Sequence, residues 1–340
     1  MNKKICISGY YGFNNFGDET ILKILTQNLK SIDNSLEITV FSSNPEETAK
    51  SLGVKSIPSF NLKSILTELY KTNCLISGGG SLLQDVTSSK SLIYYLLVLI
   101  LAKFFKKRII IFAQGIGPIK NKILRNLTFL VLKKADYITV RDTNSLEMLD
   151  KKGIKADLCS DPVWNINSNE NIQKNNKLGI QLREFYNINE LFINKLALAI
   201  NNNFSHREIV LLSLQNKLDL QILNKFKNKL SEINPSLNIR IEENNSNEKI
   251  IKEIASLQEL IAMRYHANLV GIKNNVKILP IAYDIKVKTI ADDFNIYCIN
   301  PDNPEEINDK IKEFKLKEIS YNNETINSKK FDFYKLYKHI

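Results

Sequence analysis

Residues 5–31 read ICISGYYGFNNFGDETILKILTQNLKS and contain a strand, a glycine-rich loop and a helix in immediate succession. The apolar run Ile5–Gly9 predicts a buried strand. From Asp18 to Ser31 the apolar residues recur at the spacing that places them on one face of a helix. A strand that leads through a short loop into a helix is the repeating unit of a parallel α/β sheet.

The same unit recurs in both halves of the chain. In the first half we expect further strands at Leu36–Phe41, Val54–Pro58, Cys74–Ser77, Arg108–Ala113 and Tyr137–Val140. The polar stretch Asn165–Asn176 lacks periodicity and predicts a linker. Strands then resume at Leu178–Leu182, Glu208–Ser213, Leu237–Ile241, Leu260–Met263 and Val276–Ile281.

This alternation predicts an α/β protein with two Rossmann-like domains that face each other across a cleft. The first domain covers residues 1–165 and the second covers residues 177–303. The remaining segment, residues 304–340, has a helix candidate and then a polar end with several aromatic residues, and we expect it to pack back on the first domain. A chain of 340 residues is long for one hydrophobic core and typical of two.

Composition narrows the class of protein. The formal net charge of +11 indicates anionic partners or, alternatively, a solvated lysine-rich surface. The four cysteines lack metal-ligand spacing, so they predict no metal site. The first residues lack the apolar stretch of a signal peptide, and Leu92–Ala102 is too short to span a bilayer. We therefore expect a cytoplasmic protein whose Leu92–Ala102 helix is buried or touches the inner face of a membrane.

Basic side chains follow several strands of the second half. Arg264 and His266 come directly after Leu260–Met263, Arg183 follows Leu178–Leu182, and Lys286 follows Val276–Ile281. Ligands of open α/β sheets bind beyond the carboxyl ends of the strands, so this pattern predicts an electropositive pocket. His266 is the histidine in this setting; a structural imidazole with satisfied hydrogen bonds is the alternative.

Glycine-rich loops follow two strands of the first half, one at Gly9–Glu19 and one at Gly78-Gly79-Gly80-Ser81. Glycine lets the backbone approach a ligand closely, and a tight turn is the alternative for the first loop. Three consecutive glycines favour a ligand, because each costs backbone entropy on folding. Arg141 follows a further strand and either faces the cleft or pairs with a nearby carboxylate.

Together these strings resemble the polysaccharide pyruvyl transferase family, in particular the bacterial type that decorates cell-surface, secondary cell wall polysaccharides. The resemblance rests on residues 9–19, 77–89, 113–119, 141–142, 161–163, 264–266 and 283–286. The chain departs from the family pattern at Glu184, where proline usually follows the arginine. The resemblance implies a glycosyltransferase B-like fold. It also implies transfer of a pyruvyl group from phosphoenolpyruvate to two sugar hydroxyls, which forms a cyclic ketal and releases phosphate.

The resemblance suggests roles for the residues already singled out. We expect His266 to be the catalytic base, and phosphoenolpyruvate to be held by Arg264, Lys286, Arg183 and Arg141. The glycine loops would bind the acceptor, with contributions from Gly12, Asn15, Gly17, Asp18, Gly79, Gly80, Ser81 and Asp85. Phosphoenolpyruvate is a co-substrate, so the reaction needs no cofactor and no metal. The expected acceptor is a lipid-linked saccharide, which makes peripheral membrane association plausible.

Two other functions fit parts of the sequence. A nucleotide-sugar-dependent glycosyltransferase could use the same fold, because a fold does not determine chemistry. A non-catalytic basic protein that binds acidic polymers would fit the net charge. We expect no nucleic-acid partner, because the sequence has neither a recognised motif nor a dense basic tract.

Overall fold

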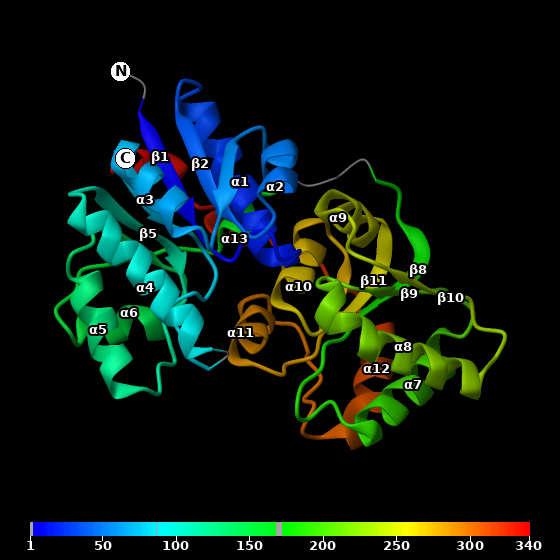
Figure 1. Cartoon of the computed structure of the whole chain (residues 1–340). Coiled ribbons are helices and arrows are strands. Elements are labelled where there is room, and N and C mark those ends of the chain that lie inside the picture. The colour runs from blue at the N-terminus through cyan, green and yellow to red at the C-terminus, as the bar shows by residue number, and fades with distance from the viewer. Residues whose placement is uncertain (1–2, 87, 168–171) are drawn as a thin grey trace. The chain divides into compact units, whose positions relative to one another are not determined.

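The computed structural model describes residues 3–86, 88–167 and 172–340 (Figure 1). The chain forms two compact units, each built on its own parallel sheet. The first unit contains Met1–Asn165 together with Lys329–Ile340, and the second contains Ile166–Ser328. The prediction of an α/β protein with two parallel sheets is therefore confirmed.

The first unit has a seven-stranded sheet in the order β3-β2-β1-β4-β5-β6-β7. Its strands are β1 (Lys4–Ser8), β2 (Glu37–Ser42), β3 (Lys55–Pro58), β4 (Cys74–Ser77), β5 (Arg108–Gln114), β6 (Tyr137–Val140) and β7 (Asp157–Leu158). Its helices within residues 1–165 are α1 (Phe16–Ile32), α2 (Pro45–Leu52), α3 (Leu62–Lys71), α4 (Ser89–Phe104), α5 (Lys122–Leu132) and α6 (Thr143–Asp150). The central strand β4 is buried along its whole length, as parallel strands covered on both faces are.

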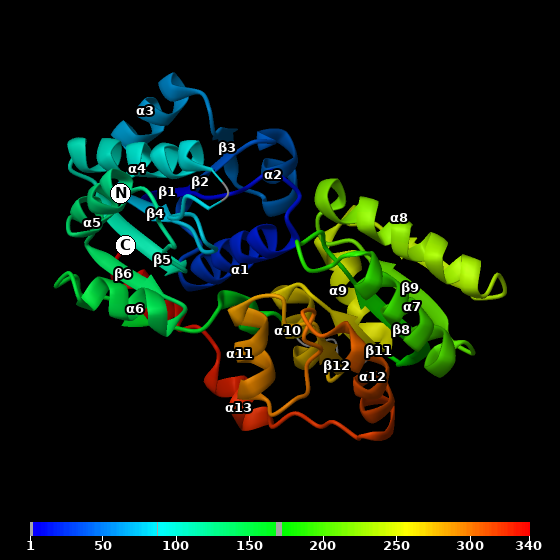
Figure 2. The same ribbon diagram turned by 90° about the horizontal axis from the view of Figure 1, so that it is seen from below.

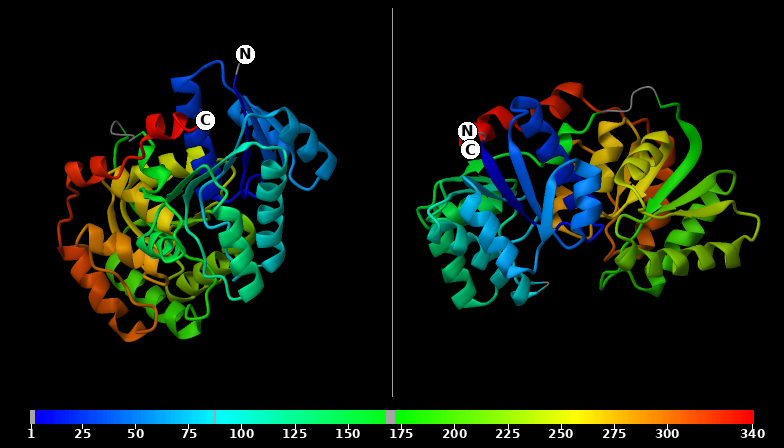
Figure 3. Two further views of the ribbon diagram at one scale, coloured as in Figure 1. Left: turned by 90° about the vertical axis from the view of Figure 1, so that its left-hand side faces the viewer. Right: turned by 45° about the horizontal axis from the view of Figure 1, so that its top comes forward.

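Helices cover this sheet on both sides. Helix α4 contacts α3 and α5, and the three lie next to one another (Figure 2). Helix α1 instead contacts η1 (Pro162–Asn165) and α14 (Phe333–Tyr337) near the end of the chain (Figure 3). Among the described residues, the structure contains no helix with both the length and the apolar character needed to cross a membrane.

The second unit has a five-stranded sheet in the order β10-β9-β8-β11-β12. Its strands are β8 (Asn175–Gln181), β9 (Glu208–Leu212), β10 (Ile239–Glu242), β11 (Leu257–Ala262) and β12 (Lys277–Pro280). Its helices are α7 (Glu190–Phe204), α8 (Asn216–Ile233), α9 (Asn247–Ser256), α10 (Tyr265–Lys273), α11 (Ile285–Asp293), α12 (Ile307–Leu316) and α13 (Asn323–Ser328). Each strand leads into a helix at the same edge of the sheet.

Two domain boundaries differ from the sequence-based expectation, and several strands begin or end a few residues from the predicted positions, such as β11, predicted at Leu260–Met263. Strand β8 begins at Asn175, inside the range predicted as a linker, because Asn175 pairs with Leu257 of β11 across the sheet. Residues 168–171 of that predicted linker lie outside the described residues. The segment 304–340, expected to act as one piece, divides instead: α12 packs on α7 in the second unit, and Lys329–Ile340 joins the first.

Aromatic side chains attach the last residues to the first unit. The Phe112 ring of β5 lies 5.0 Å from the Phe331 ring and 6.0 Å from the Phe333 ring. The Asn165 amide donates to the Phe331 carbonyl and accepts from the Phe331 N–H, at 3.0 and 2.7 Å. Residues far apart in sequence thus complete one hydrophobic core.

Each sheet contains one point at which the strand order reverses. In the first sheet β1 and β4 are neighbours although β2 and β3 lie between them in sequence, and in the second β8 and β11 are neighbours. Ligands of open α/β sheets bind beyond the carboxyl ends of the strands at such switch points. A ligand is therefore expected at the loops after β1, β4, β8 and β11.

Candidate functional site

The loop after β1 is tied to the helix that follows it. The Asn15 side chain caps α1 by accepting a hydrogen bond from the Gly17 N–H at 3.1 Å. Glu19, in the first turn of α1, accepts a hydrogen bond from the Gly12 N–H at 2.7 Å. The sequence placed the helix start at Asp18, whereas the structure begins α1 at Phe16 because Asn15 provides the cap.

Glu19 is a half-buried carboxyl group that the sequence did not assign to the site. Burial raises the pKa of Glu19 from its ordinary value of 4.5 to about 7, and the hydrogen bond from the Gly12 N–H only partly offsets this. The protonation of Glu19 therefore changes near neutral pH, at the point where the first glycine loop joins α1. In the sequence, only the position of Glu19 in the first turn of the predicted helix could have indicated a role. An acidic residue is common there because it interacts favourably with the helix dipole.

Protein atoms surround the glycines of both loops. A side chain at Gly12, whose φ is +80°, would collide with Ser42 and with the Asn44 backbone. At Gly79 an added Cβ would lie 2.9 Å from Ile21, and at Gly80, where φ is +102°, 2.6 Å from the Asp18 carboxylate. The glycines let the two loops at the switch point pack against each other and against α1. Their contact with an acceptor stays a prediction.

Arg141 pairs with a carboxylate, which was one of the two alternatives. Its guanidinium contacts Asp161 at 2.6 Å and donates to the Ser81 hydroxyl at 3.1 Å. Only 10% of the Arg141 side chain and 1% of the Asp161 side chain are exposed. The charge of Arg141 is thus balanced within the first unit, where it fixes the loop after β4 to the end of β6.

Asp85 is engaged with the backbone of a neighbouring loop. Its two carboxylate oxygens accept hydrogen bonds from the Lys120 and Asn121 N–H groups, each at 2.8 Å. These hydrogen bonds lower the pKa of Asp85 below its ordinary value. Asp85 therefore orders the approach to α5, and a direct contact with an acceptor would have to use its remaining lone pairs.

In the second unit, Arg264 is held by a carboxylate that the sequence did not reveal. Arg264 is the N-cap residue of α10, and its side chain binds Asp219 with Nη2–Oδ1 at 2.5 Å and Nε–Oδ2 at 3.0 Å. The Asp219 side chain is fully buried and also accepts from the Leu214 and Gln215 N–H groups, each at 3.0 Å. A lone aspartate in the first turn of a helix carries no signal of its own, so this partner was missed.

Arg183, after β8, has no such partner. Its Nη1 donates to the Tyr283 hydroxyl at 3.3 Å, and its guanidinium lies 5.5 Å from the centre of the Tyr283 ring. Within the described ranges no carboxylate pairs with Arg183, and its buried Nε has no hydrogen-bond acceptor. An uncompensated guanidinium with a spare donor is suited to bind an anion.

Tyr283 connects the basic residues of this edge. Burial raises the pKa of Tyr283, and the positive charges of Arg183 and Arg264 both act in the opposite direction. Both cations therefore lie close enough to Tyr283 to influence its ionisation. Tyr283 stays protonated at neutral pH, so its hydroxyl accepts from Arg183 and can still donate to a ligand.

His266 and Lys286 lie in the first turns of two neighbouring helices. His266 is the second residue of α10, is half-buried, and has its ring 5.3 Å from the Tyr265 ring. Lys286 is the second residue of α11, which Asp284 caps by accepting from the Val287 N–H at 3.0 Å. Helices α10 and α11 contact each other, and their N-termini carry positive dipole ends. The strand ends around the β8–β11 switch point are therefore rich in positive charge.

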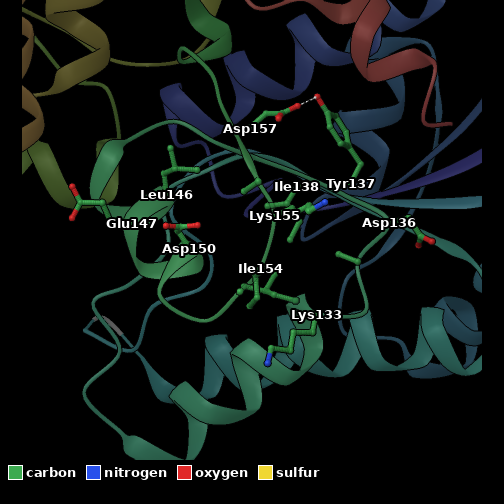
Figure 4. Close-up of a pocket in the computed structure, with 14 residues that line it drawn as sticks. Lys133, Asp136, Tyr137, Ile138, Leu146, Glu147, Asp150, Ile154, Lys155 and Asp157 are labelled. Atoms are coloured by element: carbon green, nitrogen blue, oxygen red, sulfur yellow. Dashed lines mark hydrogen bonds between the residues drawn. The ribbon is translucent and has the colours of Figure 1, made fainter.

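A separate surface hollow lies in the first unit, away from these loops (Figure 4). It has a volume of about 710 Å³ and is lined by residues between Leu132 and Asp157. Tyr137 and Asp157 begin β6 and β7, so this hollow lies at the amino ends of the strands. It is thus at the edge of the sheet opposite to the glycine loops. The described residues also contain no group of three or more histidine, cysteine, aspartate or glutamate side chains able to hold a metal ion.

Comparisons with solved structures identify the fold. The chain is similar to UDP-GlcNAc 2-epimerase from Methanocaldococcus jannaschii, with a TM-score of 0.67, 12% identity, and 96% of each chain covered. It is also similar to Anabaena Alr3699/HepE in complex with UDP and glucose, with a TM-score of 0.63, 9% identity, and 96% of this chain and 92% of that chain covered. An alpha-glucosyltransferase in complex with UDP and a 13-mer DNA gives a TM-score of 0.58 and 12% identity, with 100% of this chain and 94% of that chain covered.

These similarities establish a glycosyltransferase B-like fold, and the identities are too low to carry more. A comparison with curated protein sequences found no match. A family model described as polysaccharide pyruvyl transferase matches residues 15–285, which run from the N-cap of α1 and include the loops after β4, β8 and β11. The chain therefore belongs to the polysaccharide pyruvyl transferase family.

Proposed function

We propose that this protein transfers a pyruvyl group from phosphoenolpyruvate to two hydroxyls of a cell-surface polysaccharide sugar. The products are a cyclic ketal and inorganic phosphate. The observation that carries the proposal is the uncompensated guanidinium of Arg183 at the switch point of the second sheet, where Arg264 follows the neighbouring strand. Family membership supports the class of reaction.

Phosphoenolpyruvate would bind in the second unit. It carries a phosphate and a carboxylate, so it requires several cations in fixed positions. Nη2 of Arg183 makes no hydrogen bond within the described residues, and Asp219 uses Nε and Nη2 of Arg264 but not Nη1. Lys286 and the N-termini of α10 and α11 would add positive charge for the phosphate. Arg141, predicted to share this work, is balanced by Asp161 and is assigned here to loop structure.

His266 would accept the proton of the attacking sugar hydroxyl. In the first step the hydroxyl oxygen bonds to C2 of phosphoenolpyruvate and its proton passes to His266, while the C2–C3 π electrons take up a proton from solvent and C3 becomes a methyl group. In the second step the neighbouring hydroxyl bonds to C2, the C2–O bond to phosphate breaks, and phosphate leaves with the electron pair and takes up the proton of that hydroxyl. Imidazole exchanges protons readily near neutral pH, and His266 follows Arg264 by two residues in the first turn of α10.

The acceptor would bind at the glycine loops of the first unit. These loops flank the β1–β4 switch point, which supports the assignment of Gly12, Asn15, Gly17, Asp18, Gly79, Gly80, Ser81 and Asp85. Several of them also hold the loops together, so they would shape the pocket as well as line it. A saccharide with two adjacent free hydroxyls is the class of acceptor that this reaction needs.

Donor choice tests the proposal. The full chain is incubated with phosphoenolpyruvate and a candidate saccharide, and phosphate release and the mass of the acceptor are measured. Phosphate release together with a ketal on the acceptor supports the proposal. The solved structures of similar fold include complexes with UDP, so a parallel reaction contains a UDP-sugar. Release of UDP without use of phosphoenolpyruvate would show a glycosyltransferase instead.

A further inference from the structure

Helix α4 presents a stripe of apolar side chains to solvent. Ile93, Leu97, Ile100 and Phe104 are exposed to 50%, 43%, 41% and 77% respectively. Their spacing puts them on one face of the helix, while the other face packs Leu92, Leu96 and Leu99 into the core. The helix is therefore apolar on both sides, which is unusual for a helix on the surface of a globular domain.

The neighbouring helix also exposes apolar side chains. Helix α5 contacts α4 and exposes Ile123 to 78% and Leu130 to 62%, two turns apart (Figure 2). Just before α3, the other neighbour of α4, Phe60 is 72% exposed and its ring lies 5.4 Å from the Tyr94 ring of α4. We call the six side chains on α4 and α5 the α4–α5 face: Ile93, Leu97, Ile100, Phe104, Ile123 and Leu130. Large contiguous apolar patches of this kind mark interaction surfaces.

The sequence segment that contains this face carries nearly all the excess positive charge of the protein. Residues 60–135 contain twelve lysines and arginines but only two acidic residues, which gives +10 of the total +11. One acidic residue, Glu68, pairs with Lys55 at 2.5 Å, and the other, Asp85, accepts backbone hydrogen bonds. Lys90 on α4, and Lys122 and Arg125 on α5, are exposed on the helices that carry the apolar side chains. Lys103 on α4 is also exposed and pairs with Asp136 at 3.4 Å.

We propose that the α4–α5 face lies on the surface of an anionic lipid bilayer. Exposed leucine, isoleucine and phenylalanine side chains that insert at the headgroup level, with lysine and arginine around them, are the composition of an interfacial helix. A second copy of the chain fits poorly, because two such surfaces would bring like charges together. The length of α4 rules out a span, so the contact is peripheral.

This location also bears on the acceptor, a point that rests on the proposed function. Helix α4 begins at Ser89, a few residues after the glycine loop that follows β4. A bilayer under α4 would hold that loop near the headgroups. A saccharide on a lipid carrier could then reach the loop without leaving the membrane.

Vesicle flotation of the full chain, without any substrate, tests the contact. The probes are vesicles of phosphatidylcholine alone and vesicles of phosphatidylcholine with phosphatidylglycerol. We expect binding to the anionic vesicles and none to the neutral ones. The double variant Leu97→Glu/Ile100→Glu should bind at least about tenfold more weakly, since it removes apolar area and adds repulsion. At about 0.5 M salt, wild-type binding should weaken without disappearing, because burial of apolar surface is not screened.

A matched control uses exposed leucines of the second unit. The variant Leu198→Glu/Leu316→Glu changes side chains that are 47% and 85% exposed on α7 and α12, and it should bind vesicles like the wild type. Equal loss in both variants, or no wild-type binding to anionic vesicles, would overturn the proposal. The proposal would also be overturned if the wild type were a dimer that dissociates in the α4 variant, because a second copy of the chain would then cover the α4–α5 face. Unchanged turnover of the α4 variant on a detached, water-soluble saccharide separates membrane docking from the reaction itself.

Discussion

The carboxylate of Asp219 accepts hydrogen bonds from both Nε and Nη2 of Arg264, so the guanidinium is clamped from one side. Asp219 lies in the first turn of α8 and Arg264 at the start of α10, on either side of β8 in the second sheet. The clamp leaves Nη1 for a ligand. In the proposed mechanism Asp219 is a positioning residue, because it would act on phosphoenolpyruvate only through Arg264.

The variant Asp219→Asn should raise the KM for phosphoenolpyruvate about tenfold and change kcat less, the loss expected from one charge-assisted hydrogen bond. Two effects oppose each other: the arginine gains net positive charge but loses its fixed orientation, and we expect the loss of orientation to be larger. Glu259→Gln is the control, because Glu259 also forms a buried pair, with Arg207, at the amino end of β11. Both variants should be less stable, and only the first should change KM. If Asp219→Asn and Glu259→Gln have the same KM for phosphoenolpyruvate, Asp219 has a purely structural role.

The variant Arg183→Gln should weaken binding of phosphoenolpyruvate about a hundredfold, which is the scale of hydrogen bonds to charged groups. It should leave the melting temperature of the free protein nearly unchanged, because Arg183 has no carboxylate partner within the described residues. Thermal unfolding with and without phosphoenolpyruvate measures both quantities. Arg141→Gln should behave oppositely and cost about 3–5 kcal/mol of stability, because it removes the cation that balances the buried Asp161 carboxylate. Normal protection of Arg183→Gln by phosphoenolpyruvate would remove Arg183 from the donor site.

The variant His266→Ala should lower kcat by about a hundredfold or more, the usual contribution of a general base. Binding of phosphoenolpyruvate, measured by calorimetry, should stay within a few-fold of the wild type, because the guanidinium groups carry the anion. Tyr265→Phe in the same turn is the control and should keep most activity. Full ketal formation by His266→Ala would exclude His266 as the base.

The stability of the first unit should depend on pH through Glu19. Its pKa is about 7 when folded and near 4.5 when exposed, so the folded protein binds the proton more tightly. This contribution to stability is present below about pH 4.5 and is lost as the pH rises through 7, by on the order of 3 kcal/mol in total. Urea unfolding of the wild type and of Glu19→Gln across this range measures it. The two curves should converge at low pH, and parallel curves at all pH values would contradict the assignment.

The sequence predicted those parts of the fold that follow from periodicity. Apolar runs such as Cys74–Ser77 and Leu260–Met263 became buried strands, and the residues after them reached the expected edge of each sheet. Strand β7 was not predicted, because its two residues, Asp157 and Leu158, are too few to show hydrophobic periodicity. Strand β8 extended into an asparagine-rich stretch because pairing with β11 outweighed local propensity.

For the candidate site, residue type and position at a strand end predicted where the basic residues lie but not what balances their charge. In sequence, Arg141, Arg183 and Arg264 look alike, because each follows a predicted strand. Arg141 and Arg264 each have a buried carboxylate partner from a distant segment, whereas Arg183 has none in the described chain. The partners Asp161 and Asp219 lie 20 and 45 positions away, beyond any local pattern. Likewise, the run at Gly78-Gly79-Gly80 suggested a ligand, and the structure adds Tyr11, Ile21 and Asp18 as packing neighbours.

The return of Lys329–Ile340 to the first unit means that the polypeptide crosses between the units twice. During synthesis, the first unit emerges from the ribosome early but lacks Phe331 and Phe333 beside Phe112 until the whole second unit has been translated. A gene fragment that stops at Asn165 would therefore leave an aromatic gap in an otherwise complete sheet. Any attempt to produce this unit separately should splice the last twelve residues back onto it.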